Sequence, residues 1–133
     1  MTLFLNPFEA SYTRFGGHKA PRYISWSREN RSQLVRIPAA AGEYRRAELR
    51  SPDPTANPYL AFVLMIQAGL RGIEEGLELP PAASLNLYQA DGETLARFRS
   101  LPRSLAEAAG TADSPFIRAA VPAAVIAEYR KPR

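Results

Sequence analysis

The chain contains no cysteine, one histidine and only two lysines among its 133 residues. Without cysteine it can form neither a disulfide bond nor a thiolate metal site, and one histidine excludes a zinc site built from several histidines. The absence of cysteine also fits a cytoplasmic protein. No apolar run approaches the roughly 20 residues of a membrane helix, and no basic leader precedes the first apolar residues, so we expect neither a membrane span nor a signal peptide.

Two common catalytic motifs are also missing. The sequence FGGH at residues 15–18 lacks the spacing of a phosphate-binding Walker loop, and no GxSxG nucleophile elbow occurs. His18, in a glycine-flanked loop, is expected to be a solvated side chain. These absences argue against a P-loop nucleotidase and against a serine hydrolase.

The composition is that of one soluble globular domain. Hydrophobic residues make up 46% of the chain and charged residues 23%, with a net charge of +4. A chain of this length can bury one hydrophobic core but not two independent ones.

The basic residues are nearly all arginines, and they concentrate in the first half of the chain. Such an excess attracts anions, so nucleic acid is one possible partner. The preference for arginine over lysine points rather to planar, bidentate recognition of carboxylate or phosphate, or simply to a GC-rich genome.

The most informative stretch runs from residue 30 to residue 57, NRSQLVRIPAAAGEYRRAELRSPDPTAN. On an extended strand, Arg46, Glu48 and Arg50 share one face because residues two apart point the same way. Guanidinium groups around a carboxylate suit a site for a metal ion and anionic ligands. A solvated face of ion pairs explains the pattern equally well, and one carboxylate is too few for a complete metal site.

The pattern predicts β-structure first. Residues 2–15 suggest a mixed, partly extended entry, and residues 22–27 alternate like a strand. Residues 33–38 and 44–50 read as two further strands that form an antiparallel hairpin. Because these strands are too short to bury much area, we expect them to belong to a larger sheet.

Helices follow. Asn57 and Pro58 form a strong helix start, and the pattern predicts a long helix over residues 58–77. Its first half is apolar nearly all round, which predicts burial on several sides. Three glycines (Gly69, Gly72 and Gly76) suggest close packing against another backbone.

A helical cluster is expected at the C-terminal end, over about residues 104–131. Ser104 and Glu107 form a capping box, Ser114 and Pro115 start another helical turn, and Lys131 lies near the end of a final helix.

Several motifs occur together in the order found in one enzyme family. NPFEASYTRF, NRSQLVRIP, RRAELRSPDPTANPYLAF and NLY resemble, in this order, segments of the C-terminal part of the catalytic domain of bacterial type I glutamine synthetase. The resemblance covers about Leu3 to Arg130. It implies that residues 1–133 are one portion of that domain, with an α+β fold: antiparallel strands of the family's barrel (about 22–50), the long helix and the helical cluster.

The resemblance implies a function as well. Glutamine synthetases use ATP as a substrate and Mg²⁺ or Mn²⁺ as cofactor to join glutamate and ammonia through γ-glutamyl phosphate. They are homo-oligomers, with no role for nucleic acid or a membrane. Carried onto this chain, the family's site residues are Arg14 for glutamate, Arg31 for the transferred phosphate, Arg36 and Arg46 for the nucleotide phosphates, Glu48 for the metal, and Arg50 for the glutamate side chain and phosphate.

Two departures from the family leave alternatives open. The family's flap loop carries a glutamate, whereas here the loop is FGGHK with Lys19, which would repel ammonium; a ligase for a different amine is therefore possible. The family's N-terminal domain and the first half of its catalytic domain are absent, so we expect the chain to be inactive alone. It could also be a free-standing interaction or regulatory module. Open strand edges and apolar helix faces predict self-association or marginal stability of the isolated chain.

Overall fold

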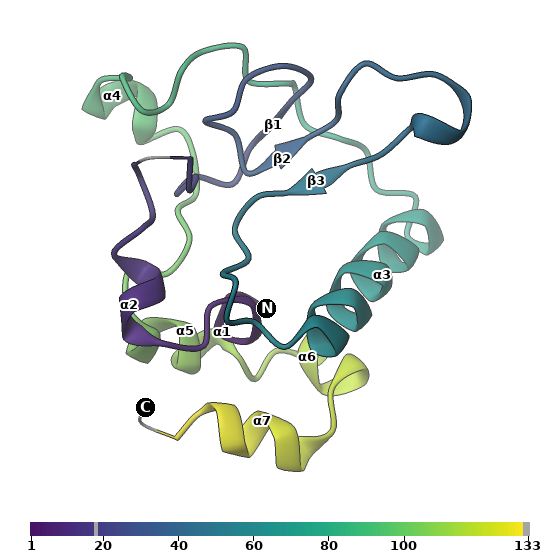
Figure 1. Cartoon of the computed structure of the whole chain (residues 1–133), viewed down its shortest axis with the longest axis vertical. Helices are drawn as coiled ribbons and strands as arrows, with labels where there is room; N and C mark the ends of the chain where they lie inside the picture. Colours follow the sequence, from purple (N-terminus) through teal and green to yellow (C-terminus); the bar gives the residue numbers. More distant parts are fainter. Residues whose placement is uncertain (18, 132–133) are drawn as a thin grey trace. The chain divides into compact units, whose positions relative to one another are not determined.

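The computed structural model describes residues 1–17 and 19–131, so the expectation for His18 lies outside the described residues. The chain divides into two compact units, each built from segments distant in sequence (Figure 1). We call them the helical unit (Met1–Thr13, Pro52–Glu78 and Pro102–Arg133) and the sheet unit (Arg14–Ser51 and Leu79–Leu101). The α+β class expected from the sequence is confirmed.

The sheet unit holds three strands of two residues each, in the order β1 (Trp26–Ser27), β2 (Val35–Arg36) and β3 (Glu48–Leu49). The predicted hairpin is confirmed, because β2 and β3 pair antiparallel with Arg36 opposite Glu48. β1, however, runs parallel to β2, so the expectation of antiparallel strands is wrong for this pair. Alternating residues predict a strand but do not encode its direction.

The direction of β2 follows from the loop that precedes it. The Ser27 hydroxyl accepts a hydrogen bond from the Asn30 backbone N–H (2.9 Å), and the Asn30 side-chain oxygen accepts one from the Ser32 N–H (2.9 Å). These local bonds, typical of Asx and Ser turns, curl the chain so that it returns alongside β1 in the same direction.

The strands are shorter than predicted because their neighbours bond elsewhere. Tyr23 pairs with Ser100 in an isolated bridge, and residues before β3 form a 3₁₀ turn, η1 (Gly42–Tyr44). The buried Gln33 side chain donates to the Leu85 carbonyl oxygen (2.8 Å). Residues 79–101, which also carry the short helix α4 (Gly92–Leu95), are thereby tied to the strands.

The helical unit contains the remaining helices: α1 (Thr2–Leu5), α2 (Glu9–Tyr12), α3 (Pro58–Glu74), α5 (Leu105–Thr111), α6 (Pro115–Ala120) and α7 (Ala123–Tyr129). α1 and α2 correct the expected extended entry. Leu3, Phe4 and Leu5 are all buried, and a strand, whose side chains alternate between faces, would point one of these neighbours away from the others. A helical turn packed against α3 and α5 buries all of them.

Three helix starts follow the predicted caps. The Asn57 side-chain oxygen accepts from the Tyr59 N–H (3.0 Å), the Ser104 hydroxyl from the Glu107 N–H (3.2 Å) and the Ser114 hydroxyl from the Ile117 N–H (3.3 Å). Glu107 does not complete the expected box, since its carboxylate accepts from the Arg103 N–H. No helix in the described part of the chain is long and apolar enough to cross a membrane.

α3 differs most from expectation. It ends at Glu74 rather than at residue 77, because Gly76 takes a positive φ of 59° and the Leu77 N–H turns back to the Gly72 carbonyl oxygen (2.9 Å). Only Leu64 is buried along the helix. A side chain placed at Gly69, Gly72 or Gly76 would meet nothing within 4 Å. The predictions of burial on several sides and of close backbone packing are therefore wrong for this chain by itself.

Candidate functional site: an arginine cluster on the sheet unit

The centre of the candidate site is the cross-strand pair of Arg36 on β2 and Glu48 on β3. Arg36 Nε donates to Glu48 Oε2 (2.8 Å) and Arg36 Nη2 donates to Glu48 Oε1 (2.9 Å), a bidentate pair. The strand register sets these side chains opposite each other. Both are half-buried, so each guanidinium or carboxylate edge that is not in the pair can meet a ligand.

Arg46 adds a second guanidinium to the same carboxylate. Its Nε donates to Glu48 Oε1 (3.2 Å), as the predicted shared face requires. Hydrogen bonds from Arg36, and secondarily from Arg46, hold the pKa of the Glu48 carboxyl below its ordinary value. The three side chains carry a net charge of +1, so the cluster stays attractive to anions while Glu48 keeps both arginines in place.

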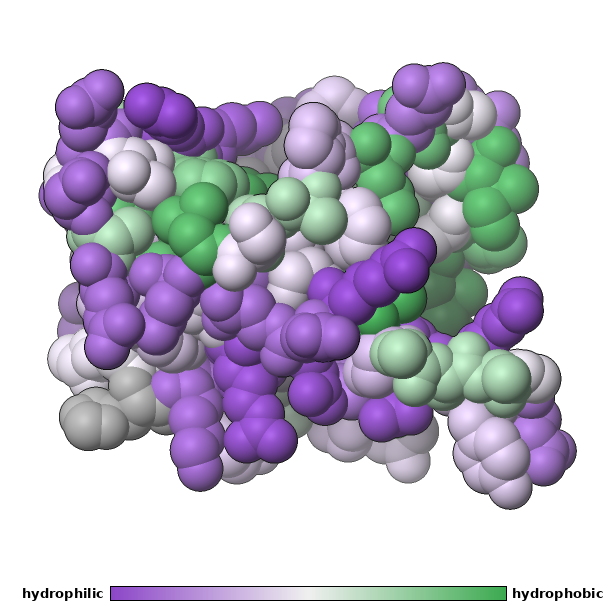
Figure 2. All heavy atoms as spheres, turned by 90° about the horizontal axis from the view of Figure 1, so that it is seen from above, coloured by the Kyte–Doolittle hydropathy of each residue, from purple (hydrophilic) through white to green (hydrophobic). Residues whose placement is uncertain are grey.

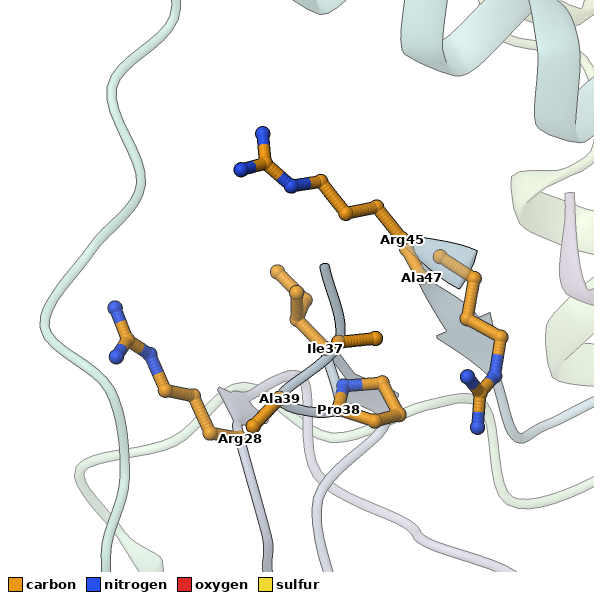
Figure 3. Close-up of a pocket in the computed structure, with 8 residues that line it drawn as sticks. Arg28, Ile37, Pro38, Ala39, Arg45 and Ala47 are labelled. Atoms are coloured by element: carbon orange, nitrogen blue, oxygen red, sulfur yellow. The ribbon is translucent and has the colours of Figure 1, made fainter. Parts of the chain in front are cut away.

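A cavity of about 650 Å³ lies next to the cluster. Figure 3 shows Arg28 and Arg45 extending toward the same side, with Ile37 between them. Its lining combines guanidinium groups with an apolar surface: Arg28, Ile37, Pro38, Ala39, Ala40, Arg45, Arg46 and Ala47. Such a lining suits a ligand with a flat apolar part and an anionic part.

Sequence reasoning did not select Arg28 and Arg45 as site residues. The only sequence signal for them is the general excess of arginine. Arg45 is an odd number of residues away from Arg46 and Glu48, so on an extended strand its side chain would point to the opposite face. The structure explains their inclusion, since residues 37–40 and the turn around η1 bulge away from the strands and turn Arg45 to the cavity.

The other predicted site residues lie in the same unit but bond differently. Arg50 donates from Nη2 to the carbonyl oxygen of Lys19 (3.1 Å), and its buried Nη1 has no hydrogen-bond partner among the described residues. Lys19 itself has a positive φ of 83°, an unusual conformation for a residue with a side chain. Arg14 donates to the Ser51 carbonyl oxygen (3.4 Å) and stacks over Phe15.

Arg31 differs from the other predicted arginines in the contacts of its guanidinium. Its side chain is exposed, and its guanidinium makes no hydrogen bond or ion pair with any part of the chain that the structure describes. Its backbone carbonyl oxygen accepts from the Tyr88 hydroxyl (3.4 Å). The structure therefore brings Arg36, Arg46 and Glu48 together and leaves Arg31 available to a ligand.

The residues present do not by themselves make a magnesium site. Among residues 1–17 and 19–131, no three acidic or histidine side chains are grouped so that they could hold a metal ion. Glu48, the carboxylate predicted to bind metal, has both oxygens engaged by arginines. A divalent ion at this position needs further oxygen ligands from outside the chain.

The lowered pKa of Glu48 predicts a pH dependence of stability. Because the folded-state pKa lies below the ordinary value of 4.5, the ionised carboxylate stabilises the folded chain above that pH, and the contribution is lost as the pH falls through the folded-state pKa. We expect the difference in unfolding free energy between the native chain and Glu48→Gln to be constant near neutral pH and to shrink below pH 4.5. Urea unfolding at a series of pH values measures it. A difference that grows on acidification would contradict the ion-pair geometry.

Comparison with known proteins places this geometry in a family. Residues 1–133 match the sequence model of the family described as "Glutamine synthetase, catalytic domain". The chain is similar to the glutamine synthetase of Methanosarcina mazei, with 45% identity over 132 residues that cover 96% of the chain and 30% of the relative. It is also similar to the glutamine synthetase of Thermus thermophilus, with 46% identity over 111 residues covering 81% of the chain and 25% of the relative.

A solved structure described as "GmaS/ADP complex-Conformation 1" has the same fold. It superposes with a TM-score of 0.80 at 29% identity, covering 97% of this chain and 30% of that one. The chain thus spans about 30% of the length of the M. mazei relative and of this structure.

Proposed function

Because this chain belongs to the glutamine synthetase catalytic-domain family, we propose that it supplies phosphate- and glutamate-binding arginines of a ligase that makes glutamine from glutamate, ammonia and ATP. The observation that carries this proposal is the Arg36–Glu48–Arg46 cluster beside an arginine-lined cavity. Since the relatives are about three times as long, the reaction requires the rest of such an enzyme, and the chain alone is inactive.

The cluster is suited to nucleotide phosphates. Phosphoryl transfer depends on positioning and on stabilising the charge that develops on the transferred group. Glu48 fixes the guanidinium groups of Arg36 and Arg46 before a ligand arrives, so little side-chain freedom remains to be lost on binding. In the cavity, Ile37 and Pro38 offer an apolar surface for a flat ring while the arginines face the phosphates. The similar solved structure is a complex with ADP, which supports this choice of ligand.

Three further arginines take the remaining roles in the proposal. Arg31, open to solvent, reaches the γ-phosphoryl group as it moves to the glutamate carboxylate. Arg14 binds the substrate glutamate. Arg50 contacts the glutamate side chain and the acyl phosphate, and its buried Nη1 without an acceptor gains one from a substrate oxygen. Each is a permanently charged fork suited to carboxylate or phosphate oxygens.

Mg²⁺ or Mn²⁺ belongs to this proposal only through the complete enzyme. Glu48 would be one of its ligands, and the others would come from the part of the catalytic domain that the chain lacks. The residues that the structure describes do not form a metal site by themselves.

Nucleotide binding by the chain alone tests the cluster directly. We expect isothermal titration calorimetry to detect Mg-ATP binding and Arg46→Ala to weaken it about 10-fold, because a hydrogen bond to a charged group contributes about 1.5 kcal/mol or more. Arg71→Ala is the matched control, since Arg71 belongs to the helical unit and forms its ion pair there with Glu75 (2.7 Å). Equal weakening by both variants would indicate unspecific charge attraction. Absence of binding would contradict a preformed nucleotide site and would mean that the site needs the rest of such an enzyme.

The loop at Lys19 favours a second candidate, a ligase for a different amine. A lysine ammonium repels NH₄⁺ by about 1 kcal/mol at 4 Å in water and by more near a protein surface. The test uses a chimera of M. mazei glutamine synthetase in which the segment matched by this chain is replaced by the chain itself. If ammonia is the amine, Lys19→Glu should raise the kcat/KM for ammonia about 5-fold or more, because a repelling positive charge is replaced by an attracting negative one. Lys19→Gln only removes the positive charge, so its kcat/KM should lie between the two. A chimera that uses a primary alkylamine and ignores ammonia would establish the second candidate.

A further inference from the structure

The long helix α3 presents its apolar side to solvent. It is anchored to the helical unit by Leu64, which is fully buried, and by Arg71, whose guanidinium lies 6.0 Å from the centre of the Phe116 ring on α6. α3 also contacts α1. Six large apolar residues of the helix are nevertheless exposed: Tyr59, Phe62, Val63, Ile66, Leu70 and Ile73. We call these six residues the outer stripe.

The outer stripe lies directly opposite the anchored face. At 100° per residue, its six members fall within an arc of roughly 100° centred on the side of the helix away from Leu64. Two polar residues of the helix lie nearer to the anchored face: by the same count Gln67 and Arg71 are closer to Leu64 than to the centre of the stripe, and Glu74 lies about midway between the two.

The stripe gathers exposed large apolar side chains along one side of the whole helix. Tyr59 is 81% exposed and Ile73 78% exposed, whereas a monomeric soluble protein rarely exposes a contiguous apolar patch of more than a few hundred Å². Figure 2 shows that hydrophobic residues reach the surface in more than one area of that view. Because no charged residue lies within the stripe, it fits an apolar protein surface and not an anionic polymer.

We propose that the outer stripe is the docking face for the part of a glutamine synthetase catalytic domain that lies outside the segment matched by this chain. That part is the occupant because the matched relatives devote about 70% of their length to it (30% of the M. mazei relative is matched). The match to this relative covers 96% of the chain. The occupant belongs either to the same polypeptide or to a separate one; in both cases α3 becomes a buried helix between two layers.

Docking explains two observations that the chain alone does not. The first half of α3 is apolar on nearly all sides, which is typical of a helix buried in a large protein, and yet Leu64 is its only buried residue. The glycines at positions 69 and 72 have open space where a Cβ would stand, and space of this kind lets another backbone approach closely. This inference depends on family membership and not on the proposed reaction.

Coexpression tests the inference without measuring activity. The chain is produced together with M. mazei glutamine synthetase from which the matched segment has been deleted, and a tag on the chain is used to isolate complexes. We expect a defined complex of the two polypeptides and a larger soluble yield of the deleted enzyme. The variant Ile66→Glu/Ile73→Glu should reduce the recovered complex at least 10-fold, because two carboxylates would have to be buried without partners.

The controls separate docking from misfolding and from general stickiness. Both substituted residues are exposed in the chain, so the far-UV circular dichroism and the thermal midpoint of the variant should be unchanged. Tyr44→Glu, at an apolar residue of η1 that is 70% exposed, should leave the complex intact. Failure to recover the complex with the native chain would overturn the inference. A discrete homodimer of the chain that the double variant dissociates, with no complex formed, would also overturn it and identify a second copy as the occupant.

Discussion

Replacing Arg31 with alanine in the chimeric enzyme is expected to lower kcat about 1,000-fold while changing the KM for glutamate little. An arginine that contacts a transferring phosphoryl group is worth roughly 10³–10⁵ in rate. Its effect falls on kcat when the contact is stronger in the transition state than in the ground state. The structure is consistent with this use, because the guanidinium of Arg31 is exposed and has no partner among residues 1–17 and 19–131.

Two variants make the result interpretable. Arg31→Lys keeps the charge and loses the planar fork, so it should recover only part of the lost rate. Arg97→Ala removes another exposed arginine of the sheet unit, one that pairs only weakly with Glu93 (3.5 Å), and should leave kcat unchanged. Steady-state kinetics with ATP, glutamate and ammonia provides the measurement. A kcat for Arg31→Ala within a few-fold of the chimera would remove Arg31 from the phosphoryl-transfer step.

The parts of the structure that were predictable from sequence are those fixed by neighbours in the chain. Asn57, Ser104 and Ser114 begin helices because each side chain reaches an N–H two or three residues ahead. The antiparallel hairpin of β2 and β3 follows from two alternating runs joined by one connection. The caps are local and the hairpin joins neighbouring segments, so spacing predicts both, whereas the register that sets Arg36 opposite Glu48 is known only from the structure.

The features that the sequence did not predict depend on distant parts of the chain or on irregular loops. The helical turns at Leu3–Leu5 depend on α3 and α5, which come much later in the chain. The parallel direction of β1 and β2 depends on a loop around Asn30 whose side-chain bonds are not visible as periodicity. Arg28 and Arg45 join the site through the path of a non-repetitive turn. Tertiary context decides each of these, and a single sequence gives no direct measure of it.

The burial predicted for α3 is not found in this chain, where Leu64 is the only buried residue of the helix. Apolar residues on nearly every side do state that the helix must be covered, and a pattern of this kind cannot say which polypeptide covers it. The exposed outer stripe is therefore informative as a discrepancy. It shows that the 133 residues do not bury all the apolar side chains of α3.

This distinction predicts opposite behaviour for two residues on the same helix. In the isolated chain, Leu64→Ala should lower the free energy of unfolding by about 3 kcal/mol, because Leu64 is fully buried and truncating a buried leucine removes its transfer free energy and leaves a cavity. Ile66→Ala should change that free energy by less than about 0.5 kcal/mol, because Ile66 is 59% exposed. Urea unfolding followed by circular dichroism measures both values.

In the chimera the second value should change and the first should not. Once the outer stripe is covered, Ile66 is a core residue, and Ile66→Ala should cost about 2 kcal/mol or more. Leu64 faces the helical unit in both proteins, so its cost should stay near the value found in the chain alone. If Ile66→Ala remains nearly neutral in the chimera, nothing packs on the stripe there, and α3 keeps an exposed apolar face even in the complete enzyme. If it becomes costly, the burial that the sequence demands is supplied by the part of the catalytic domain that this chain does not contain.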